Sequence, residues 1–319
     1  MIEVKNLTKR YGNHLAVDHL NFTVECGKIY GFLGPNGAGK STTMNIMTGY
    51  LGATEGQVLI DGHDILKEPE EAKKNIGYLP EIPPLYMEMT VREYLEFAAE
   101  LKGIKKDKRE PQIEEVIRLA KLRAVENRLI QNLSKGYKQR VGLAQAVLGF
   151  PEIIILDEPT VGLDPKQIIE IRELIRKLAK KHTVILSSHI LAEVREVCDY
   201  IMIISGGKLV ASDTTENLEN MMSGKGQIEV EAKAPRDEMD HIIRRTGKIK
   251  EVKYCTSASG ITTAQIIAKG GEDIREELFL AFSHADVPML TLNQSKTTLE
   301  EIFLELTQGS GNRMIKEGK

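Results

Sequence analysis

The sequence predicts an α/β fold with a parallel sheet at its core, and three consecutive stretches of chain indicate it. The first, "IIILD" at 153–157, is a short apolar run typical of a strand that is buried on both faces. An amphipathic helix pattern follows, beginning at Asp164-Pro165, where a capping residue precedes proline at the first helical position. The third stretch, "TVILSSH", is a second buried strand. Strand, helix and strand in this order predict neighbouring parallel strands.

The first third of the chain predicts a different kind of sheet. Apolar and polar residues alternate in "MIEVKNL" and "HLNFTVECGKIYGFLG" within residues 1–33, as in strands that have one solvated face. Residues 57–66 predict a hairpin with Asp61-Gly62 as its tight turn. From about 85 to 150, apolar residues recur at helical spacing, first behind Thr90, a predicted N-cap. We therefore expect an antiparallel β subdomain and a helical insertion around the parallel core.

A linker, "SGKGQ", predicts a boundary between a domain of residues 1–223 and an accessory domain of residues 224–319. The second part predicts a β-α-β-β-α-β order, the ferredoxin-like arrangement of a small α+β domain. A last helix is expected from Thr298, which forms a capping-box pattern with Glu301. The six predicted elements are strand 227–234, helix 236–246, strand 249–257, strand 261–268, helix 272–285 and strand 287–293.

Composition limits the classes of function. Of the 319 residues, 41% are hydrophobic and 28% are charged, and the formal net charge of −3 favours neither a nucleic acid nor an acidic surface as partner. The three cysteines, Cys26, Cys198 and Cys255, have no CxxC spacing and indicate ordinary thiols in a reducing compartment. No apolar run approaches the length of a membrane helix, and the N-terminus shows no signal stretch. We expect a cytoplasmic protein that touches a membrane only through a partner.

The clearest motif is "GFLGPNGAGKST", which contains the phosphate-loop pattern Gly34-x4-Gly39-Lys40-Ser41 between a predicted strand and a predicted helix. Its glycines let successive backbone N–H groups point at phosphate oxygens, Lys40 brings a positive charge to them, and Ser41 offers a hydroxyl to Mg²⁺. A glycine-rich turn without a ligand is the competing interpretation. The pattern thus predicts a P-loop NTPase core in which the nucleotide-binding residues are Gly34, Pro35, Asn36, Gly37, Ala38, Gly39, Lys40, Ser41 and Thr42.

Acidic and imidazole side chains follow the two buried strands. Asp157 is predicted to hold Mg²⁺, and Glu158 to act as general base toward the attacking water. His189 ends the next strand, so its imidazole is expected to contact the terminal phosphate or to orient the water. Tyr11, expected in a loop, offers a ring that can stack on adenine. The alternatives are solvated acids at a strand end, a structural histidine and an ordinary tyrosine.

These motifs together resemble the ATPase subunit of an ATP-binding cassette (ABC) transporter. Over residues 1–220 the order of motifs is Tyr11, the P-loop, "YLPE" ending at Glu81, "LSKGY" at 133–137, "ILDEPT", "GLDP" and His189. The wording of "YLPE", "LSKGYKQRVGLAQA" and "TLEEIFLELT" is similar to the bacterial drug-efflux, bacteriocin-immunity and gliding-motility-type branch. The resemblance implies ATP and Mg²⁺ as cofactors, with Lys40, Glu158 and His189 as catalytic residues and with Ser41, Glu81 and Asp157 as metal ligands.

The resemblance also implies two cassettes that face head to tail. Ser134 and Gly136, at the start of a helix, would contact the γ-phosphate held by the second copy, although an N-cap serine without a ligand gives the same pattern. Lys135 and Tyr137 depart from the family's Leu-Ser-Gly-Gly-Gln, and Glu81 stands where glutamine is usual. The helical block and the loop "PEIPPLYMEM" before it would contact transmembrane permease subunits. A proline loop packed on its own domain is the alternative.

The sequence therefore predicts an Mg²⁺-dependent ATPase that drives a permease, by the branch resemblance an exporter, at the cytoplasmic face of the membrane. The rival hypothesis is a soluble ABC-type ATPase that remodels nucleic acid or ribosomes. A single P-loop, the absence of heptads and the net charge of −3 weigh against that rival. As an additional hypothesis, residues 224–319 form a ligand-sensing regulatory module.

Overall fold

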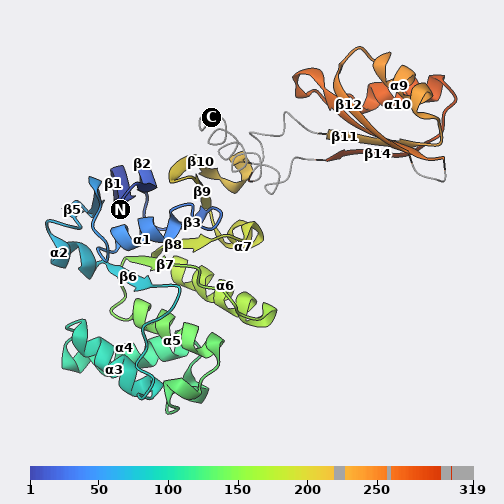
Figure 1. Ribbon diagram of the computed structural model, residues 1–319. Helices are drawn as coiled ribbons and strands as arrows, with labels where there is room; N and C mark the ends of the chain where they lie inside the picture. Colours follow the sequence, from blue (N-terminus) through green and yellow to red (C-terminus); the bar gives the residue numbers. More distant parts are fainter. Residues whose placement is uncertain (219–226, 257–259, 296–302, 304–319) are drawn as a thin grey trace. The chain divides into compact units, whose positions relative to one another are not determined.

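The computed structural model describes residues 1–218, 227–256, 260–295 and 303 (Figure 1). Contacts between Cα atoms divide them into two compact units, of which the first is Met1–Thr214 and the second begins at Thr215. Each unit is described by itself. The predicted helix from Thr298 lies outside the described residues, and the predicted domain boundary at 223/224 stays a prediction.

The first unit is built on a six-stranded sheet in the order β10-β9-β3-β8-β7-β6. All neighbouring pairs are parallel except β9 and β10, which are antiparallel. The three central strands are completely buried, which explains why two of them are continuous apolar runs in the sequence. The strands are β3 (Ile29–Leu33), β6 (Ile76–Leu79), β7 (Ile153–Leu156), β8 (Thr183–Ser188), β9 (Tyr200–Ser205) and β10 (Lys208–Thr214).

A second sheet, antiparallel in the order β2-β1-β4-β5, confirms the predicted β subdomain. Its last two strands form the predicted hairpin, with Asp61 at φ 50° and Gly62 at φ 88° in the turn. Positive φ at both central residues is the mark of a type I′ turn. The strands are β1 (Ile2–Tyr11), β2 (His14–Val24), β4 (Glu55–Ile60) and β5 (His63–Asp64), and their apolar faces share one core with β3, β7 and α1.

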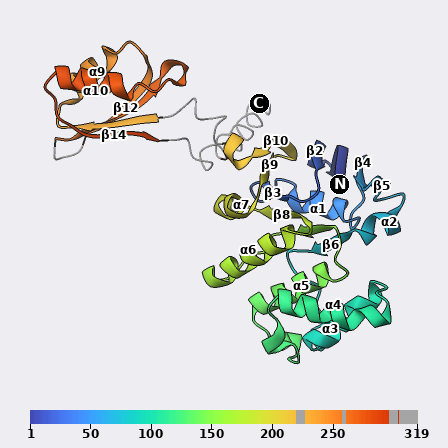
Figure 2. The same cartoon turned by 180° about the vertical axis from the view of Figure 1, so that it is seen from behind.

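The helical insertion is also confirmed. Figures 1 and 2 place α3, α4 and α5 together, on the opposite side of the parallel sheet from β1 and β2. Thr90 caps α3 through a complete capping box, since its hydroxyl accepts from Glu93 N and the Glu93 carboxylate accepts from Thr90 N. The helices of this unit are α1 (Lys40–Met47), α2 (Pro69–Lys74), α3 (Val91–Leu101), α4 (Lys106–Leu119), α5 (Lys135–Val147), α6 (Pro165–Ala179) and α7 (Leu191–Val197).

One lysine links two helices of the insertion. Lys102, at the end of α3, donates from Nζ to the carbonyl oxygens of Gln145 at 2.8 Å and Leu148 at 2.6 Å. These carbonyls lie in the last turn of α5, where helical C=O groups have no partner within the helix. Burial lowers the pKa of Lys102 to about 8.

The second unit has the predicted ferredoxin-like order. Its antiparallel sheet runs β12-β13-β11-β14, and α9 and α10 pack on it around a separate apolar core. Observed boundaries lie within a few residues of those expected. The elements are β11 (Gln227–Ala232), α9 (Arg236–Arg244), β12 (Ile249–Thr256), β13 (Thr262–Ala268), α10 (Arg275–His284) and β14 (Met289–Ser295).

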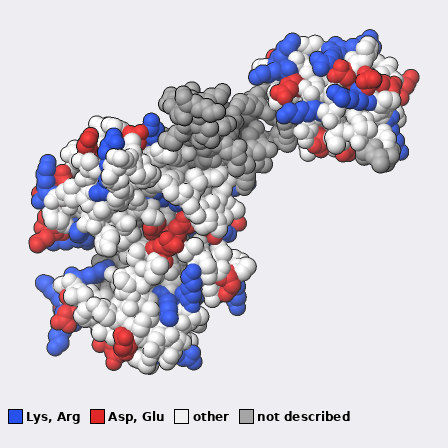
Figure 3. Space-filling view, viewed as in Figure 1, with Lys and Arg blue, Asp and Glu red and all other residues white. Residues whose placement is uncertain are grey.

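The described residues contain no helix that is both long enough and apolar enough to cross a membrane. Charged side chains are mixed on the surface. On the face shown in Figure 3, lysine and arginine lie in small groups that alternate with acidic and uncharged residues. This agrees with the small net charge of the whole sequence, −3.

Gly77 in β6 sets the distance between the sheet and α5. A methyl group on Gly77 would lie 2.1 Å from the carbonyl oxygen of Ala146, which is backbone and cannot rotate away. We therefore expect Gly77→Ala to lower the free energy of unfolding in urea by about 1–3 kcal/mol. Gly52→Ala is the matched control, because a methyl group there meets no atom within 4 Å and its effect should stay within about 0.5 kcal/mol. Equal effects of the two substitutions would contradict the packing argument.

Candidate active site

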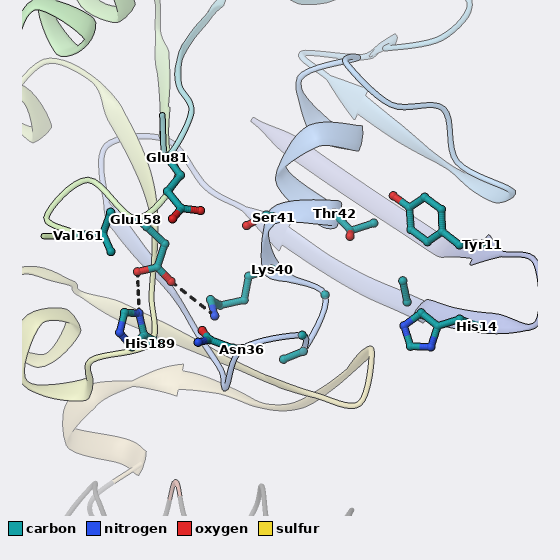
Figure 4. Close-up of a pocket in the computed structure, with 14 residues that line it drawn as sticks. Tyr11, His14, Asn36, Lys40, Ser41, Thr42, Glu81, Glu158, Val161 and His189 are labelled. Carbon is teal, nitrogen blue, oxygen red and sulfur yellow. Dashed lines mark hydrogen bonds and ion pairs between the residues drawn. The ribbon is translucent and has the colours of Figure 1, made fainter. Parts of the chain in front are cut away.

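A cavity of about 420 Å³ lies at the carboxyl edge of the parallel sheet (Figure 4). Parallel strands end at the same edge, so the segments after β3, β6, β7 and β8 all reach it. Among the predicted residues, Tyr11, Glu81, Glu158 and His189 line the cavity together with the 36–42 part of the P-loop. Gly34, Pro35 and Asp157 lie directly behind this lining, whereas Ser134 and Gly136 are not part of it. The lining residues are Tyr11, His14, Ala16, Asn36, Gly37, Ala38, Gly39, Lys40, Ser41, Thr42, Glu81, Glu158, Val161 and His189.

The P-loop is held in a shape that only glycine permits at key points. Gly39 has φ 103° and precedes α1, and a methyl group there would lie 2.5 Å from the carbonyl oxygen of Ala16. Gly34 is equally enclosed, since a methyl group on it would meet the carbonyl oxygen of Ile204 at 2.4 Å. The loop therefore forms a backbone cradle at the N-terminus of a helix, which is a favourable place for phosphate.

Lys40 is the buried cation of the site. Its side chain is only 6% exposed, and Nζ donates to the carbonyl oxygens of Gly34 at 2.8 Å and Pro35 at 3.3 Å. The same ammonium lies 3.5 Å from Glu158 Oε1. A buried charge is stable only with such partners, and a phosphate can replace the carboxylate among them.

Glu158 connects this cation to His189. Its Oε2 lies 2.9 Å from Nδ1 of His189, so the two carboxylate oxygens face the two candidate catalytic partners (Figure 4). The backbone of Glu158 has φ 47°, in the left-handed region that a residue with a side chain rarely adopts. Backbone strain of this kind persists only where surrounding contacts enforce it, and it gathers at functional sites.

Ser187 supplies one such contact. Its buried hydroxyl donates to Asp157 Oδ1 at 2.6 Å and accepts from the backbone N–H of Glu158 at 2.8 Å. Sequence reasoning did not single out Ser187, although it lies in the "SSH" that drew attention to His189. The missed signal was a pair of hydroxyl side chains, Ser187 and Ser188, directly after the apolar run of β8.

The residues expected at the metal site fit Mg²⁺. Ser41 Oγ lies 3.2 Å from Asp157 Oδ1, so a hydroxyl and a carboxylate converge beside the P-loop, and Glu81 lines the same cavity. Mg²⁺ prefers hard oxygen ligands and usually takes one or two carboxylates together with substrate phosphates. Within the described parts of the chain, no three His, Cys, Asp or Glu residues gather into a group that could hold a metal by themselves.

The negative charge of Asp157 also affects the pKa of the neighbouring Tyr78. Tyr78 is partly buried, and its hydroxyl donates to Asn45 Oδ1 at 2.9 Å. Burial raises the pKa of Tyr78 well above its usual range, and the charge of Asp157 raises it further. Tyr78 therefore stays protonated and serves as a hydrogen-bond donor behind the site.

The far end of the cavity is aromatic. Tyr11 is 49% exposed and is the last residue of β1, so its prediction as a loop residue was wrong, because β1 continues up to the turn. His14, paired with Tyr11 across the β1–β2 hairpin, also lines the cavity and was missed. Ala16 and Val161 were missed as well, since nothing in their residue type indicates a site.

Ser134 and Gly136 lie elsewhere in the unit. Ser134 caps α5 by accepting from Tyr137 N at 3.5 Å, as its sequence context suggested. A methyl group on Gly136 would lie 2.5 Å from the side chain of Gln167 in α6, and one on Gly162 would lie 2.1 Å from Lys135 Nζ. The start of α5 thus packs on the start of α6, and a methyl group at position 136 would require the flexible end of the Gln167 side chain to move.

The fold and this cavity define a P-loop ATPase, and comparison with known proteins gives the family. The family model described as ABC transporter matches residues 17–161. The bacitracin transport ATP-binding protein BcrA of Bacillus licheniformis is 35% identical, over 97% of this chain and 98% of that protein. The linearmycin resistance ATP-binding protein LnrL of Bacillus subtilis (strain 168) is 31% identical, over 96% and 98%. The chain therefore belongs to the ATP-binding subunits of the ABC transporter family.

Solved structures agree. An ATP-binding subunit of an ABC transporter matches with a TM-score of 0.64 and 32% identity, covering 69% of this chain and 92% of that one. A dimeric cassette in a post-hydrolysis state, bound to ADP and Pi, matches with a TM-score of 0.61 and 28% identity, covering 67% and 98%. This chain is thus an ATP-binding and ATP-hydrolysing subunit, of a family whose members work with a membrane permease.

Ser187→Ala tests the bridge between Asp157 and Glu158. It leaves the buried N–H of Glu158 without its acceptor, which costs about 1–3 kcal/mol. We expect kcat for ATP hydrolysis to fall about 10- to 100-fold, because the strained backbone of Glu158 is no longer held. Ser187→Thr keeps the hydroxyl and should retain most of the activity, as measured by phosphate release. Equal activity of Ser187→Ala and the unsubstituted protein would refute the role of this bridge.

Proposed function

We propose that two copies of this chain, or this chain and a related cassette, bind two Mg-ATP molecules between them in a head-to-tail arrangement. Hydrolysis then drives a membrane permease that exports its substrate. The observation that carries the proposal is the arrangement of Lys40, Glu158 and His189 around one cavity at the carboxyl edge of the sheet. A buried cation, a carboxylate and an imidazole in contact there supply phosphate binding, a base and a water-orienting group.

The predicted residues at the cavity divide this chemistry among them. The P-loop N–H groups and Lys40 bind the phosphates, and Tyr11 stacks on the base at the opposite end. Ser41, Asp157 and Glu81 would hold Mg²⁺, which would supply positive charge to the phosphate oxygens. Glu158 accepts the proton of the attacking water, and His189 fixes the direction of that carboxylate and contacts the terminal phosphate.

The start of α5 supplies the second half of the site. Ser134 and Gly136 lie outside the cavity of their own chain, so a γ-phosphate reaches them only from another molecule. The solved relative that is a dimeric cassette with ADP and Pi supports this arrangement. Bound ATP joins the two copies, and loss of the γ-phosphate lets them separate, as in a ligand-driven shift between two states.

The loop after β6 is the proposed permease contact. It begins at Glu81 in the cavity and continues through Ile82, which is 82% exposed, to Tyr86, whose ring packs against Phe97 of α3 at 5.3 Å. A loop that joins the nucleotide site to the helical insertion and also exposes apolar side chains is suited to transmit motion to a partner. Through this contact the chain is held at the cytoplasmic face of the membrane.

The names of two relatives support export. One is named for bacitracin transport and another for linearmycin resistance, and both align with nearly all of this chain. We infer that this chain likewise drives export, and that the permease selects the exported compound.

Glu158→Gln tests the assigned base. The amide keeps the size of the side chain but accepts no proton from water, so kcat should fall at least about 100-fold. ATP binding should persist, and with Mg-ATP the variant should accumulate as a dimer. Phosphate release and light scattering after size-exclusion chromatography measure the two effects.

Lys40→Ala is the control for that experiment, because it removes the cation that binds the phosphates and should therefore form no ATP-dependent dimer. Hydrolysis by Glu158→Gln at the unsubstituted rate would falsify the base assignment. If the protein stays monomeric in saturating Mg-ATP, even in the presence of the permease, the proposal that two cassettes share the nucleotide is wrong.

Ile82→Asp tests the permease contact. A carboxylate in an apolar interface costs several kcal/mol, so copurification with the membrane subunits should be lost while the unfolding midpoint stays unchanged. Leu66→Asp is the matched control, since Leu66 is 51% exposed, follows β5 and lies outside both the loop and the helical insertion. Equal loss of copurification in both variants would argue against the loop as the specific contact.

A further inference from the structure

Glu193 is a buried acid beside the site that the catalytic scheme does not use. It lies in α7, just after His189, and is 6% exposed. Its Oε2 accepts from Thr160 Oγ1 at 2.6 Å and from Ser188 Oγ at 3.1 Å. Both hydroxyls are buried as well. A buried carboxylate is costly unless donors satisfy it, so these two hydrogen bonds hold Thr160 and Ser188 to one oxygen atom.

The two donors come from the segments that carry the catalytic candidates. Thr160 lies two residues after Glu158, and Ser188 immediately precedes His189. Ser187 already links the two strand ends through Asp157 Oδ1 and the N–H of Glu158. Glu193 is a second link between the same segments, one step further from the sheet. Together the two links fix the distance between the segment after β7 and the end of β8. The 2.9 Å contact between Glu158 and His189 depends on that distance.

A positive charge lies near this acid. Arg172 of α6 lines the same small cavity of about 10 Å³ as Glu193 and Thr160. Within the described chain, Arg172 Nε is buried and has no hydrogen-bond partner, while Nη1 pairs with Glu196.

We propose that Glu193 is a positioning residue for ATP hydrolysis, which holds the Glu158 and His189 segments in register through Thr160 and Ser188. This inference rests on the proposed roles of Glu158 and His189. Glu193 is not among the residues that line the nucleotide cavity, such as Tyr11 and Lys40. Its proposed role is therefore confined to the hydrolytic step. Its loss should therefore lower kcat and leave ATP binding nearly unchanged.

Glu193→Ala is the direct test. We expect kcat to fall about 10- to 100-fold while KM for ATP and the affinity for a fluorescent ATP analogue change less than about threefold. Glu193→Gln keeps one carbonyl oxygen that accepts both hydroxyls, so it should recover kcat to within about fivefold of the unsubstituted protein. Glu152→Ala, which removes an exposed acid immediately before β7 at the amino end of the strand, is the matched control and should leave both parameters unchanged.

A double-mutant cycle keeps the proposal testable if Glu193→Ala folds poorly. Thr160→Val and Ser188→Ala each remove one donor, and each should lower kcat. In a Glu193→Leu background, which has no acceptor, neither substitution should lower kcat much further. Additive losses, an unchanged kcat in Glu193→Ala, or no recovery in Glu193→Gln would overturn the inference while the unsubstituted protein still hydrolyses ATP. If the unsubstituted protein does not hydrolyse ATP at all, the proposed function fails first and the inference fails with it.

Discussion

A buried ammonium group dominates the organisation of this ATPase. Burying an ammonium group is costly without partners, and Lys40 finds them in two carbonyl oxygens of its own loop and in the carboxylate of Glu158. Those partners come from the segments after β3 and β7. The need to neutralise one side chain therefore brings together the loop that binds phosphate and the acid proposed to activate water.

The parallel sheet makes this neutralisation possible. Buried parallel strands end at a common edge, so short polar segments from distant parts of the sequence lie close together there. This arrangement carries backbone strain at Glu158, whose φ of 47° is unfavourable for a residue with a side chain. Ser187 of β8 and Glu193 of α7 hold that segment in place, because they accept hydrogen bonds from Glu158 N and Thr160 Oγ1. The proposed chemistry depends on this support as much as on the residues that face the nucleotide.

The sequence was sufficient where local rules decide the structure. The apolar run of β7, the hairpin at Asp61-Gly62 and the cap at Thr90 each follow from side-chain periodicity or turn chemistry, and each was confirmed. The P-loop and the acids after β7 were recognisable because their residue types and spacing are constrained by phosphate and metal binding.

Tertiary contacts could not be predicted in the same way. Ser187, Glu193 and His14 gain their importance from neighbours in space, and nothing in "SSH" or "LAEV" states which strand end lies opposite. Gly136 illustrates the converse, because its sequence context suggested a ligand contact, while the folded chain adds close packing against the movable end of Gln167 as a second and weaker reason. The two reasons are compatible, since a helix start that packs closely on α6 within one chain can still present its N–H groups to another.

The most direct measurement is a crystal structure of the protein with Mg²⁺ and a non-hydrolysable ATP analogue. The account predicts that Lys40 Nζ leaves Glu158 for the terminal phosphates, while Glu158 keeps its contact with His189 and faces the position of an attacking water. Phosphates bound away from the P-loop, or a Lys40 that still pairs with Glu158 while the analogue is bound, would contradict it.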